Sequence, residues 1–420
     1  EDLRLTESGL KKGHVNVPKY RAMYLDAALK SNQELSVEKN REFKGMVRNM
    51  KTIEDSDYEV PDSLRSIMRG YQKSGFLWLK TLRENGFGGI LADDMGLGKT
   101  LQVISLLLSE QESAKAGERE WHRSLIVCPA SLVYNWQKEI SRFAPQIKTT
   151  LVTGLATERQ RIVRHTKEGE VLITSYDLLK RDVELYRDMV FAIQVIDEAQ
   201  YIKNAMSVGA GAVKQLKAQT RLALTGTPME NHPGELWSIF DFVLPGYLNS
   251  FAQFMHRFGT GEEADVLRNR IRPFLLRRLK GDVLRELPEK VEITLTADMT
   301  EEQRRVYQAS LLRLRPQVEG MLGGNNRIEM LAAITELRQI CGHPSLVLPS
   351  YAASSGKLDL LLDVLPGSLE AGHRALIFSQ FTRMLKILQR RLEAVGISCM
   401  YLDGETPPKR RVEMVQQFNA

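Results

Sequence analysis

The sequence predicts an α/β protein in which helices cover both faces of a parallel β-sheet. Five short runs rich in Ile, Leu and Val carry this prediction, together with the helical patterns between them. The runs do not alternate apolar with polar residues, which is typical of strands buried on both faces. A helical pattern, "TLQVISLLL", follows the first run. We expect the strands at residues 88–92, 124–129, 170–176, 192–198 and 221–226.

The length and composition of the chain limit which classes of protein it can belong to. The 420 residues, 43% of them hydrophobic, suffice for two or three domains with their own cores. No apolar run approaches the ~20 residues of a membrane helix, and no secretion signal is present, so we expect no membrane partner. Cys128, Cys341 and Cys399 form neither a disulfide nor a zinc pattern, which suits a reducing cytosol. The net charge of +6 permits an anionic partner such as nucleic acid but does not require one.

We expect three regions along the chain. Residues 1–61 form an accessory segment, in which residues 35–50 have a helical pattern and residues 53–63 resemble a linker. Residues 62–290 hold the predicted sheet, and residues 291–420 begin a second domain. Because Glu1 is not a methionine, we expect the chain to be part of a longer protein.

The second domain starts a new strand and helix pattern after a charge-rich stretch at residues 274–290. Helical segments are expected at residues 300–341. Residues 374–381 and 397–404 then have the pattern of strands, on either side of a helical pattern at residues 382–395. Two strands are fewer than a complete sheet needs, so we expect this domain to be truncated.

The stretch "ILADDMGLGKTLQ", residues 90–102, has the features of a phosphate-binding loop. Gly96, Gly98, Lys99 and Thr100 follow a predicted strand and precede a predicted helix. Glycines let backbone N–H groups converge on phosphate oxygens, and the helix N-terminus adds partial positive charge. Lys99 can reach the β- and γ-phosphates, and Thr100 can ligate Mg²⁺. Asp93 stands where the usual first glycine would be.

A pair of carboxylates, Asp197 and Glu198, ends another buried strand. Two carboxylates in this position are costly unless a cation meets them. Asp197 would hold Mg²⁺ through water, and Glu198 would activate the attacking water. A lysine on the phosphates, a metal and a positioned water are what phosphoryl transfer needs, so the pattern predicts nucleotide hydrolysis.

Hydroxyl-bearing residues follow other predicted strands at the same edge of the sheet. Ser131 and Thr174 stand where hydroxyl and N–H groups can hold phosphates, contacts that carry no sequence information. Thr225 and Thr227 can hydrogen-bond the catalytic carboxylates, but taken alone these two residues favour ordinary turn chemistry. Trp136 is compatible both with stacking on bases and with packing in the core.

The ordered motifs resemble those of a known family, the SWI/SNF-like ATPases of helicase superfamily two, which are double-stranded DNA translocases. The resemblance covers residues 62–420. A bacterial member is indicated by the form of "DEAQYIKN" and by the lack of large insertions. It implies two RecA-like lobes, residues 62–290 and 291–420, the second truncated, with ATP bound between them. The matching stretches are "GYQKSGFLWL", "DDMGLGKT", "LIVCPASLVYNWQKEI", "TSYDLL", "DEAQYIKN", "LALTGTPMEN", "FLLRRLKGDVLRELPEK", "LRQICGHP", "ALIFSQF" and "YLDGET".

The resemblance also implies roles for individual residues. The nucleotide-binding residues are Gln72, which reads adenine, and Asp94, Gly96, Leu97, Gly98, Lys99 and Thr100 of the phosphate loop, whose Asp93 is a family trait. Lys99, Asp197, Glu198 and Gln200 are catalytic, with Thr100 and Asp197 toward the metal. Ser131, Trp136, Thr174 and Ser175 contact DNA, and Thr225, Gly226 and Thr227 couple the lobes. Arg277 and Arg278 are compatible with DNA contact, with bracing of the lobes and with a solvated basic face.

The function implied is an ATP-driven motor that uses Mg²⁺ and tracks the backbone of double-stranded DNA. Protein partners are expected through the N-terminal segment, and the location is the bacterial cytoplasm at the nucleoid, or the nucleus if the source is eukaryotic. Two alternatives stay open: an RNA helicase of the DEAD-box type, and a nucleotide-gated DNA-binding scaffold. Relatives continue past this chain's last residue with a motif that supplies two arginines to the nucleotide. The resemblance therefore implies that this chain binds ATP but hydrolyses it poorly.

Overall fold

The computed structural model describes residues 10–11, 14–15, 44–45, 58–117, 120, 122–283, 291–321 and 327–419. The chain divides into two compact units, Glu1–Leu287 and Pro288–Ala420. Most of the accessory segment, including most of the helix expected at residues 35–50, lies outside the described residues, as do residues 284–290. Within that segment, β1 (Leu10–Lys11) pairs antiparallel with β2 (His14–Val15).

The first unit is built on a parallel sheet with the strand order β5-β6-β4-β7-β8-β3-β9. The five predicted strands are confirmed as β3 (Gly89–Leu91), β4 (Ser124–Cys128), β6 (Val171–Ser175), β7 (Val190–Ile196) and β8 (Lys217–Leu224). The sequence did not predict β5 (Thr149–Leu151) and β9 (Leu275–Leu276). Both lie at sheet edges, are half-buried and are too short to give a periodic pattern.

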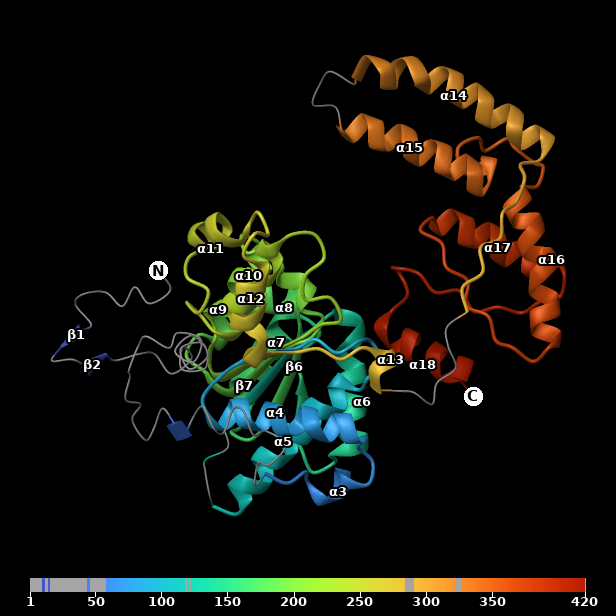
Figure 1. Cartoon of the computed structure of the whole chain (residues 1–420). Helices are drawn as coiled ribbons and strands as arrows, with labels where there is room; N and C mark the ends of the chain where they lie inside the picture. The colour runs from blue at the N-terminus through green and yellow to red at the C-terminus, as the bar shows by residue number, and fades with distance from the viewer. Residues whose placement is uncertain are drawn as a thin grey trace. The chain divides into compact units, whose positions relative to one another are not determined.

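Helices cover both faces of this sheet. From β3 through β4 to β5 the chain moves toward one edge, and from β5 through β6, β7 and β8 to β9 it returns. Connections between parallel strands of one sheet are right-handed. Helices in connections that run toward one side of the sheet therefore cover one face, and helices in connections that run back cover the other face. The helices α4, α5 and α6 accordingly pack together on one face, and α8, α9 and α10 on the other (Figure 1). The helices are α3 (Asp62–Arg65), α4 (Gly70–Glu84), α5 (Lys99–Lys115), α6 (Val133–Phe143), α7 (Ala156–His165), α8 (Tyr176–Asp182), α9 (Val208–Gln215), α10 (Pro233–Val243), α11 (Phe251–Phe258), α12 (Ala264–Ile271) and α13 (Lys280–Val283).

The helix α5, which follows the predicted phosphate loop, is the most enclosed helix of this layer. Every residue from 101 to 108 is buried, because α5 lies between the sheet, α4 and α6. Short 3₁₀ turns join other elements: η4 (Ala130–Leu132), η5 (Val183–Tyr186), η6 (Ala199–Ile202) and η7 (Arg272–Phe274). A helix held on all sides fixes the position of the loop at its N-terminus.

The described part of the second unit is helical. It contains α14 (Glu301–Met321), α15 (Arg327–Gly342), the 3₁₀ turn η8 (Pro344–Leu346), α16 (Gly356–Glu370), α17 (Thr382–Ala394) and α18 (Pro408–Asn419). The helices predicted at residues 300–341 and 382–395 are confirmed. A small hydrophobic core of this unit consists of Leu346, Leu358, Met384 and Leu388. Among the described residues of either unit, none of the helices has the length and apolar character needed to span a membrane.

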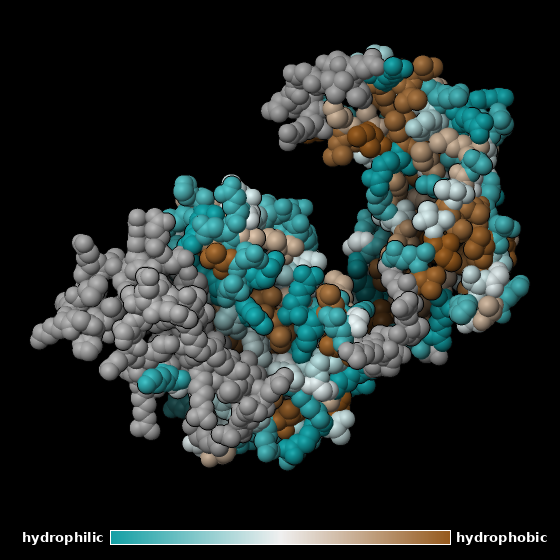
Figure 2. Space-filling model, viewed as in Figure 1, coloured by the Kyte–Doolittle hydropathy of each residue, from teal (hydrophilic) through white to brown (hydrophobic). Residues whose placement is uncertain are grey.

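The prediction of strands at residues 374–381 and 397–404 is wrong. Among the described residues of the second unit, neither segment forms a strand. Leu376 and Phe378 are 67% and 86% exposed, and Figure 2 shows apolar colour on the visible surface of this unit. A buried parallel strand needs neighbouring strands that supply ladder hydrogen bonds, and these segments have none among the described residues, although Ile377 and Phe381 pack against the small core. The α/β class with a helix-covered parallel sheet is confirmed in the first unit.

Candidate nucleotide-binding site

The strand order of the first unit brings three predicted motifs to one edge of the sheet. In the order β7-β8-β3, each strand is parallel to the next, so their carboxyl ends lie side by side. The phosphate loop follows β3, Thr225 follows β8, and Asp197 follows β7. The ammonium of Lys99 lies within electrostatic range of Asp197 and Glu198. Residues that are about a hundred positions apart in the sequence therefore form one site.

The phosphate loop has a backbone that suits anion binding. Gly96 and Gly98 have φ values of 85° and 74°, in the left-handed region that glycine adopts without steric cost. Gly98 is the N-cap of α5, so the loop delivers the free N–H groups of that helix toward any bound anion. A Cβ atom at Gly98 would lie 2.3 Å from Nε2 of Gln72, so a larger residue here would displace the Gln72 side chain.

Lys99 lies at the base of this loop with its side chain turned inward. Its Nζ donates to the carbonyl oxygens of Asp93, at 2.7 Å, and Asp94, at 3.4 Å. Burial lowers the pKa of Lys99, and the nearby carboxylates of Asp197 and Glu198 oppose that shift. The oxygens of a phosphate would be stronger acceptors than these neutral carbonyls, so the ammonium fits a nucleotide phosphate.

Gln72 packs against the phosphate loop from α4. Its Nε2 donates to the carbonyl oxygen of Leu97 at 3.1 Å, and its Oε1 accepts from the backbone N–H of Arg69 at 2.9 Å. The structure thus places the predicted adenine-reading residue next to the predicted phosphate-binding residues. That Gln72 reads adenine stays a prediction.

The carboxylate of Asp197 is held by two donors. Trp136 Nε1 donates to Oδ2 at 2.8 Å, and the backbone N–H of Glu198 donates to Oδ1 at 2.9 Å. Burial raises the pKa of Asp197, while the Trp136 hydrogen bond opposes that shift. Glu198 has a φ of 54°, which is unusual for a residue other than glycine and is found mainly at functional sites. A divalent cation facing Asp197 would favour its ionised form.

Gln200 connects Glu198 to the predicted coupling residues. Its Nε2 donates to Glu198 Oε2 at 2.7 Å, and its Oε1 accepts from Thr225 Oγ1 at 3.1 Å. Thr225 Oγ1 in turn accepts from the backbone N–H of Thr227 at 3.0 Å, across Gly226. The hydroxyl of Thr225 is therefore linked to the Glu198 carboxylate through Gln200.

The donor set fits magnesium bound together with a nucleotide. In the described part of the chain, no group of three or more His, Cys, Asp and Glu side chains is arranged around a common metal position. Magnesium in nucleotide sites needs no such group, because phosphate oxygens and waters supply most of its ligands. Thr100, in the first turn of α5, and Asp197 would supply the protein oxygens.

Three of the four residues expected to contact DNA are buried in this structure. Trp136, Thr174 and Ser175 are only 1%, 0% and 3% exposed. Trp136 donates to Asp197, Thr174 Oγ1 donates to the carbonyl of Val152 at 3.1 Å, and Ser175 caps α8. Their polar atoms form hydrogen bonds inside the protein, and their contact with DNA stays a prediction. Ser131, in η4, is exposed, and its contact with DNA stays a prediction.

Sequence reasoning missed the partner of Asp93. This fully buried carboxylate forms an ion pair with Arg278, with 2.5 Å between Oδ2 and Nη2. Asp93 therefore replaces the usual glycine as an anchor of the loop. Arg278, whose role was open, braces the loop within the first unit, whereas Arg277 is exposed. The two partners are 185 positions apart, so no local sequence pattern could have revealed the pair.

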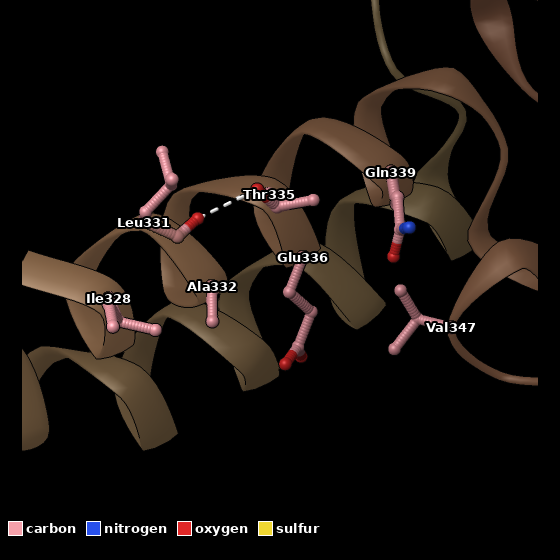
Figure 3. A pocket seen from close by; sticks show the side chains of 7 residues that line it. All are labelled: Ile328, Leu331, Ala332, Thr335, Glu336, Gln339 and Val347. Carbon is pink, nitrogen blue, oxygen red and sulfur yellow. Dashed lines mark hydrogen bonds between the residues drawn. The ribbon is translucent and has the colours of Figure 1, made fainter. Parts of the chain in front are cut away.

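A shallow hollow on the second unit is separate from these motifs. It lies along α15, and the hydroxyl of Thr335 donates to the carbonyl of Leu331 at 2.7 Å beside it (Figure 3). Its lining residues are Ile328, Leu331, Ala332, Thr335, Glu336, Gln339 and Val347. None of them is among the predicted site residues, so the hollow is not the nucleotide site.

The fold and the site define the class: an α/β protein with a phosphate loop and a pair of carboxylates at neighbouring strand ends. The chain matches the SNF2-related domain family over residues 71–346, which is more than half of its length. It belongs to that family, and the resemblance seen in the sequence is confirmed. Residues 1–61 match the family described as bacterial SNF2 helicase associated, and residues 356–420 match the helicase conserved C-terminal domain.

Individual relatives are similar along most of this chain. The protein YwqA of Bacillus subtilis (strain 168) is 35% identical over 396 residues, which are 90% of this chain and 42% of YwqA. The human SWI/SNF-related matrix-associated actin-dependent regulator of chromatin subfamily A member 1 is 35% identical over 378 residues, 84% of this chain and 35% of that protein. The chain thus spans less than half the length of either relative.

A solved structure is also similar, that of the Sulfolobus solfataricus SWI2/SNF2 ATPase core in complex with dsDNA. It is 33% identical in sequence, and the match covers 86% of this chain and 77% of the other, with a TM-score of 0.49.

Proposed function

We propose that this chain is the motor core of an ATP-dependent double-stranded DNA translocase. One observation carries the proposal. The loop ending in Lys99 and the carboxylates Asp197 and Glu198 lie close together at the carboxyl ends of β3 and β7, which are separated in the sheet by β8. Membership of the SNF2-related family supports it. YwqA, provisionally named an ATP-dependent helicase/translocase, supports it further.

Each residue at this edge has a part in ATP hydrolysis. Lys99 and the N–H groups of α5 would bind the phosphates, and Thr100 and Asp197 would hold the magnesium ion. Glu198 accepts a proton from the attacking water, and Gln200 orients Glu198 through its 2.7 Å hydrogen bond. Such positioning and charge stabilisation account for most of phosphoryl-transfer catalysis.

Double-stranded DNA is the proposed track. The net charge of +6 and the exposed Ser131 in η4 are compatible with contacts to phosphates, which position a protein without reading sequence. The matches to SNF2 families favour DNA over the RNA of a DEAD-box helicase. The match of residues 1–61 favours a bacterial motor at the nucleoid, with protein partners bound through that segment.

Equilibrium titrations with polynucleotides test the track. Duplex DNA and duplex RNA of matched length and sequence are titrated against the chain in the presence of Mg-ATP. We expect tighter binding of DNA, with equal affinities for duplexes of unrelated sequence. A preference for RNA would favour the helicase alternative, and a strong preference for one DNA sequence would contradict backbone tracking.

A further inference from the structure

Arg278 makes an unusually complete set of contacts with the start of the phosphate loop. Its Nε and its backbone N–H donate to Asp93 Oδ1 at 2.9 and 3.1 Å, and its Nη2 donates to Oδ2 at 2.5 Å. Asp93 is fully buried, and the Arg278 side chain is 14% exposed. A two-pronged contact of this kind fixes both the direction and the distance of the carboxylate.

The same guanidinium reaches the two helices that flank the loop. Nη2 donates to Gln102 Oε1 of α5 at 2.7 Å, and Nη1 donates to the carbonyl oxygen of Tyr71 in α4. Gln102 Nε2 closes the cluster by donating to Asp93 Oδ2 at 3.2 Å. A Cβ atom at Gly75 of α4 would lie 1.7 Å from Gln102 Oε1, so the cluster is closely packed. One side chain therefore links the loop, the helix after it and the helix that carries Gln72.

The backbone around Arg278 is tied to the loop as well. Beyond the pairing of β9 with β3, the N–H of Ala92 donates to Leu276 O at 2.7 Å and that of Asp94 to Arg278 O at 3.0 Å. The N–H of Lys280 donates to Asp94 Oδ2 at 3.0 Å. The segment that leaves the sheet after β9 is thus fastened to the loop at three successive points.

We infer that Arg278 is a positioning residue of the nucleotide site, acting through Asp93 to hold the phosphate loop between α4 and α5. The inference rests on the proposed function, because it assumes that this loop binds ATP. Arg278 itself contacts the loop and its flanking helices and not the phosphates.

The physical reason is the buried charge at the loop's first residue. Without Arg278, the Asp93 carboxylate would keep Gln102 and backbone N–H groups as donors and Lys99 as a nearby cation, but it would lose its buried ion pair, and the loss of one partner of such a pair is strongly unfavourable. The loop would relieve that cost by moving the carboxylate toward water. Such a shift would misplace the N–H groups and Lys99, and misplacements of about 1 Å can reduce function on the order of 100-fold.

The test compares Mg-ATP affinity in two adjacent arginine variants. Arg278→Gln should weaken Mg-ATP binding by about 10- to 100-fold. Arg277→Gln, which alters the exposed neighbouring arginine, should bind Mg-ATP as the parent chain does. Arg278→Lys keeps the positive charge but loses the forked contact, and should give an intermediate affinity. Thermal unfolding of each variant without nucleotide defines a temperature at which all of them are folded.

Affinity at that temperature separates positioning from a general effect on stability. A merely structural role would lower the melting temperature of Arg278→Gln and leave the affinity of the folded protein unchanged, which would overturn the inference. If Arg278→Gln does not fold, Arg278→Lys decides by the same criterion. Failure of the parent chain to bind Mg-ATP, or unchanged binding by Lys99→Ala, would overturn the proposed function and this inference together. Normal binding by the Arg278 variants alone would overturn only the inference.

Discussion

Asp93 and Asp197 are both buried carboxylates that follow strands of the same sheet, and their neighbours give them different roles. The charge of Asp93 is met by Arg278, so this carboxylate anchors the loop. Asp197 is held by Trp136 and a backbone N–H, neither of which carries a charge. It therefore keeps its capacity to face a cation. The type of residue does not distinguish the two positions, whereas the contacts do.

Glu198 should be needed for hydrolysis but not for binding. Glu198→Gln keeps the shape of the side chain and removes the base, so single-turnover ATP hydrolysis should fall by about 10²–10⁴-fold while Mg-ATP affinity stays near that of the parent. Glu184→Gln, which alters an exposed carboxylate, should hydrolyse ATP at the parent rate. Hydrolysis by Glu198→Gln at the parent rate would exclude Glu198 as the base.

Two glycines at opposite ends of α5 allow a matched test of the loop. Gly98 and Gly117 both have positive φ, 74° and 77°, so alanine at either position should destabilise the fold by ~1–2 kcal/mol. Only at Gly98 would the new Cβ meet a neighbour, Gln72 Nε2 at 2.3 Å, whereas at Gly117 it would meet open space. Titration of Mg-ATP should therefore show weaker binding for Gly98→Ala alone. Equal affinities in the two variants would mean that loop geometry does not control binding.

At the scale of elements, α4 and α5 are joined by a buried group of charges. Glu110 of α5 accepts from Lys80 Nζ at 2.8 Å and from Arg83 Nε at 3.0 Å, both on α4. Burial opposes ionisation of Glu110, but the two cations prevail and lower its pKa below the usual value. This group sets the distance between the helix of Gln72 and the helix of Lys99.

Removal of the Glu110 charge should destabilise the first unit. Glu110→Gln removes the carboxylate that pairs with Arg83 and Lys80 and leaves Lys80 its second carboxylate, Glu84 at 3.0 Å, so the free energy of unfolding should fall by about 3 kcal/mol near neutral pH. A carboxylate with a lowered folded pKa stabilises above its unfolded pKa, and that stability is lost as pH falls through the folded pKa. Denaturant unfolding should therefore show a smaller loss of stability on acidification in the variant than in the parent.

The control for this prediction lies two residues further along the same helix. Glu112→Gln alters an exposed carboxylate and should change the free energy of unfolding by no more than about 0.5 kcal/mol. Equal effects of the two substitutions would show that the Glu110 pairs do not stabilise the packing of α4 on α5.

The limits of sequence-based prediction are also clearest at this scale. Strands β4, β6 and β7 are buried along most of their length and rich in aliphatic residues, so each one gives its own signal. Strand β9 has two residues, and its place in the sheet depends on pairing with β3, far away in the sequence. Residues 374–381 have the same aliphatic signal as the true strands but form no ladder, because the signal reports apolar content and not the presence of partners.

The candidate site was predictable where a motif is continuous. Lys99 with its glycines, and Asp197 with Glu198, were assigned from short stretches that follow strands. Trp136 lies in a stretch expected to contact DNA, but its burial on the inner side of α6 and its hydrogen bond to Asp197 depend on tertiary packing. Contacts that join distant segments leave no local pattern.

At the scale of the whole molecule, binding of duplex DNA should depend on salt and not on sequence. Each phosphate neutralised by a Lys or Arg adds about −0.9 to the slope of log affinity against log salt concentration. Fluorescence anisotropy with duplexes of unrelated sequence, measured over a series of salt concentrations, should give one common steep slope. A flat dependence would contradict a motor that grips the DNA backbone.

The central claim is that the loop from Asp93 to Thr100 binds ATP, and titration of Mg-ATP against two lysine variants of α5 tests it most directly. Lys99→Ala should weaken binding by about 10- to 100-fold, because hydrogen bonds to charged groups contribute ~1.5–3 kcal/mol and each ~1.4 kcal/mol is tenfold. Lys115→Ala removes an exposed lysine from the other end of the same helix and should bind Mg-ATP as the parent does. Equal affinities of Lys99→Ala and the parent chain would contradict the assignment of the phosphate loop.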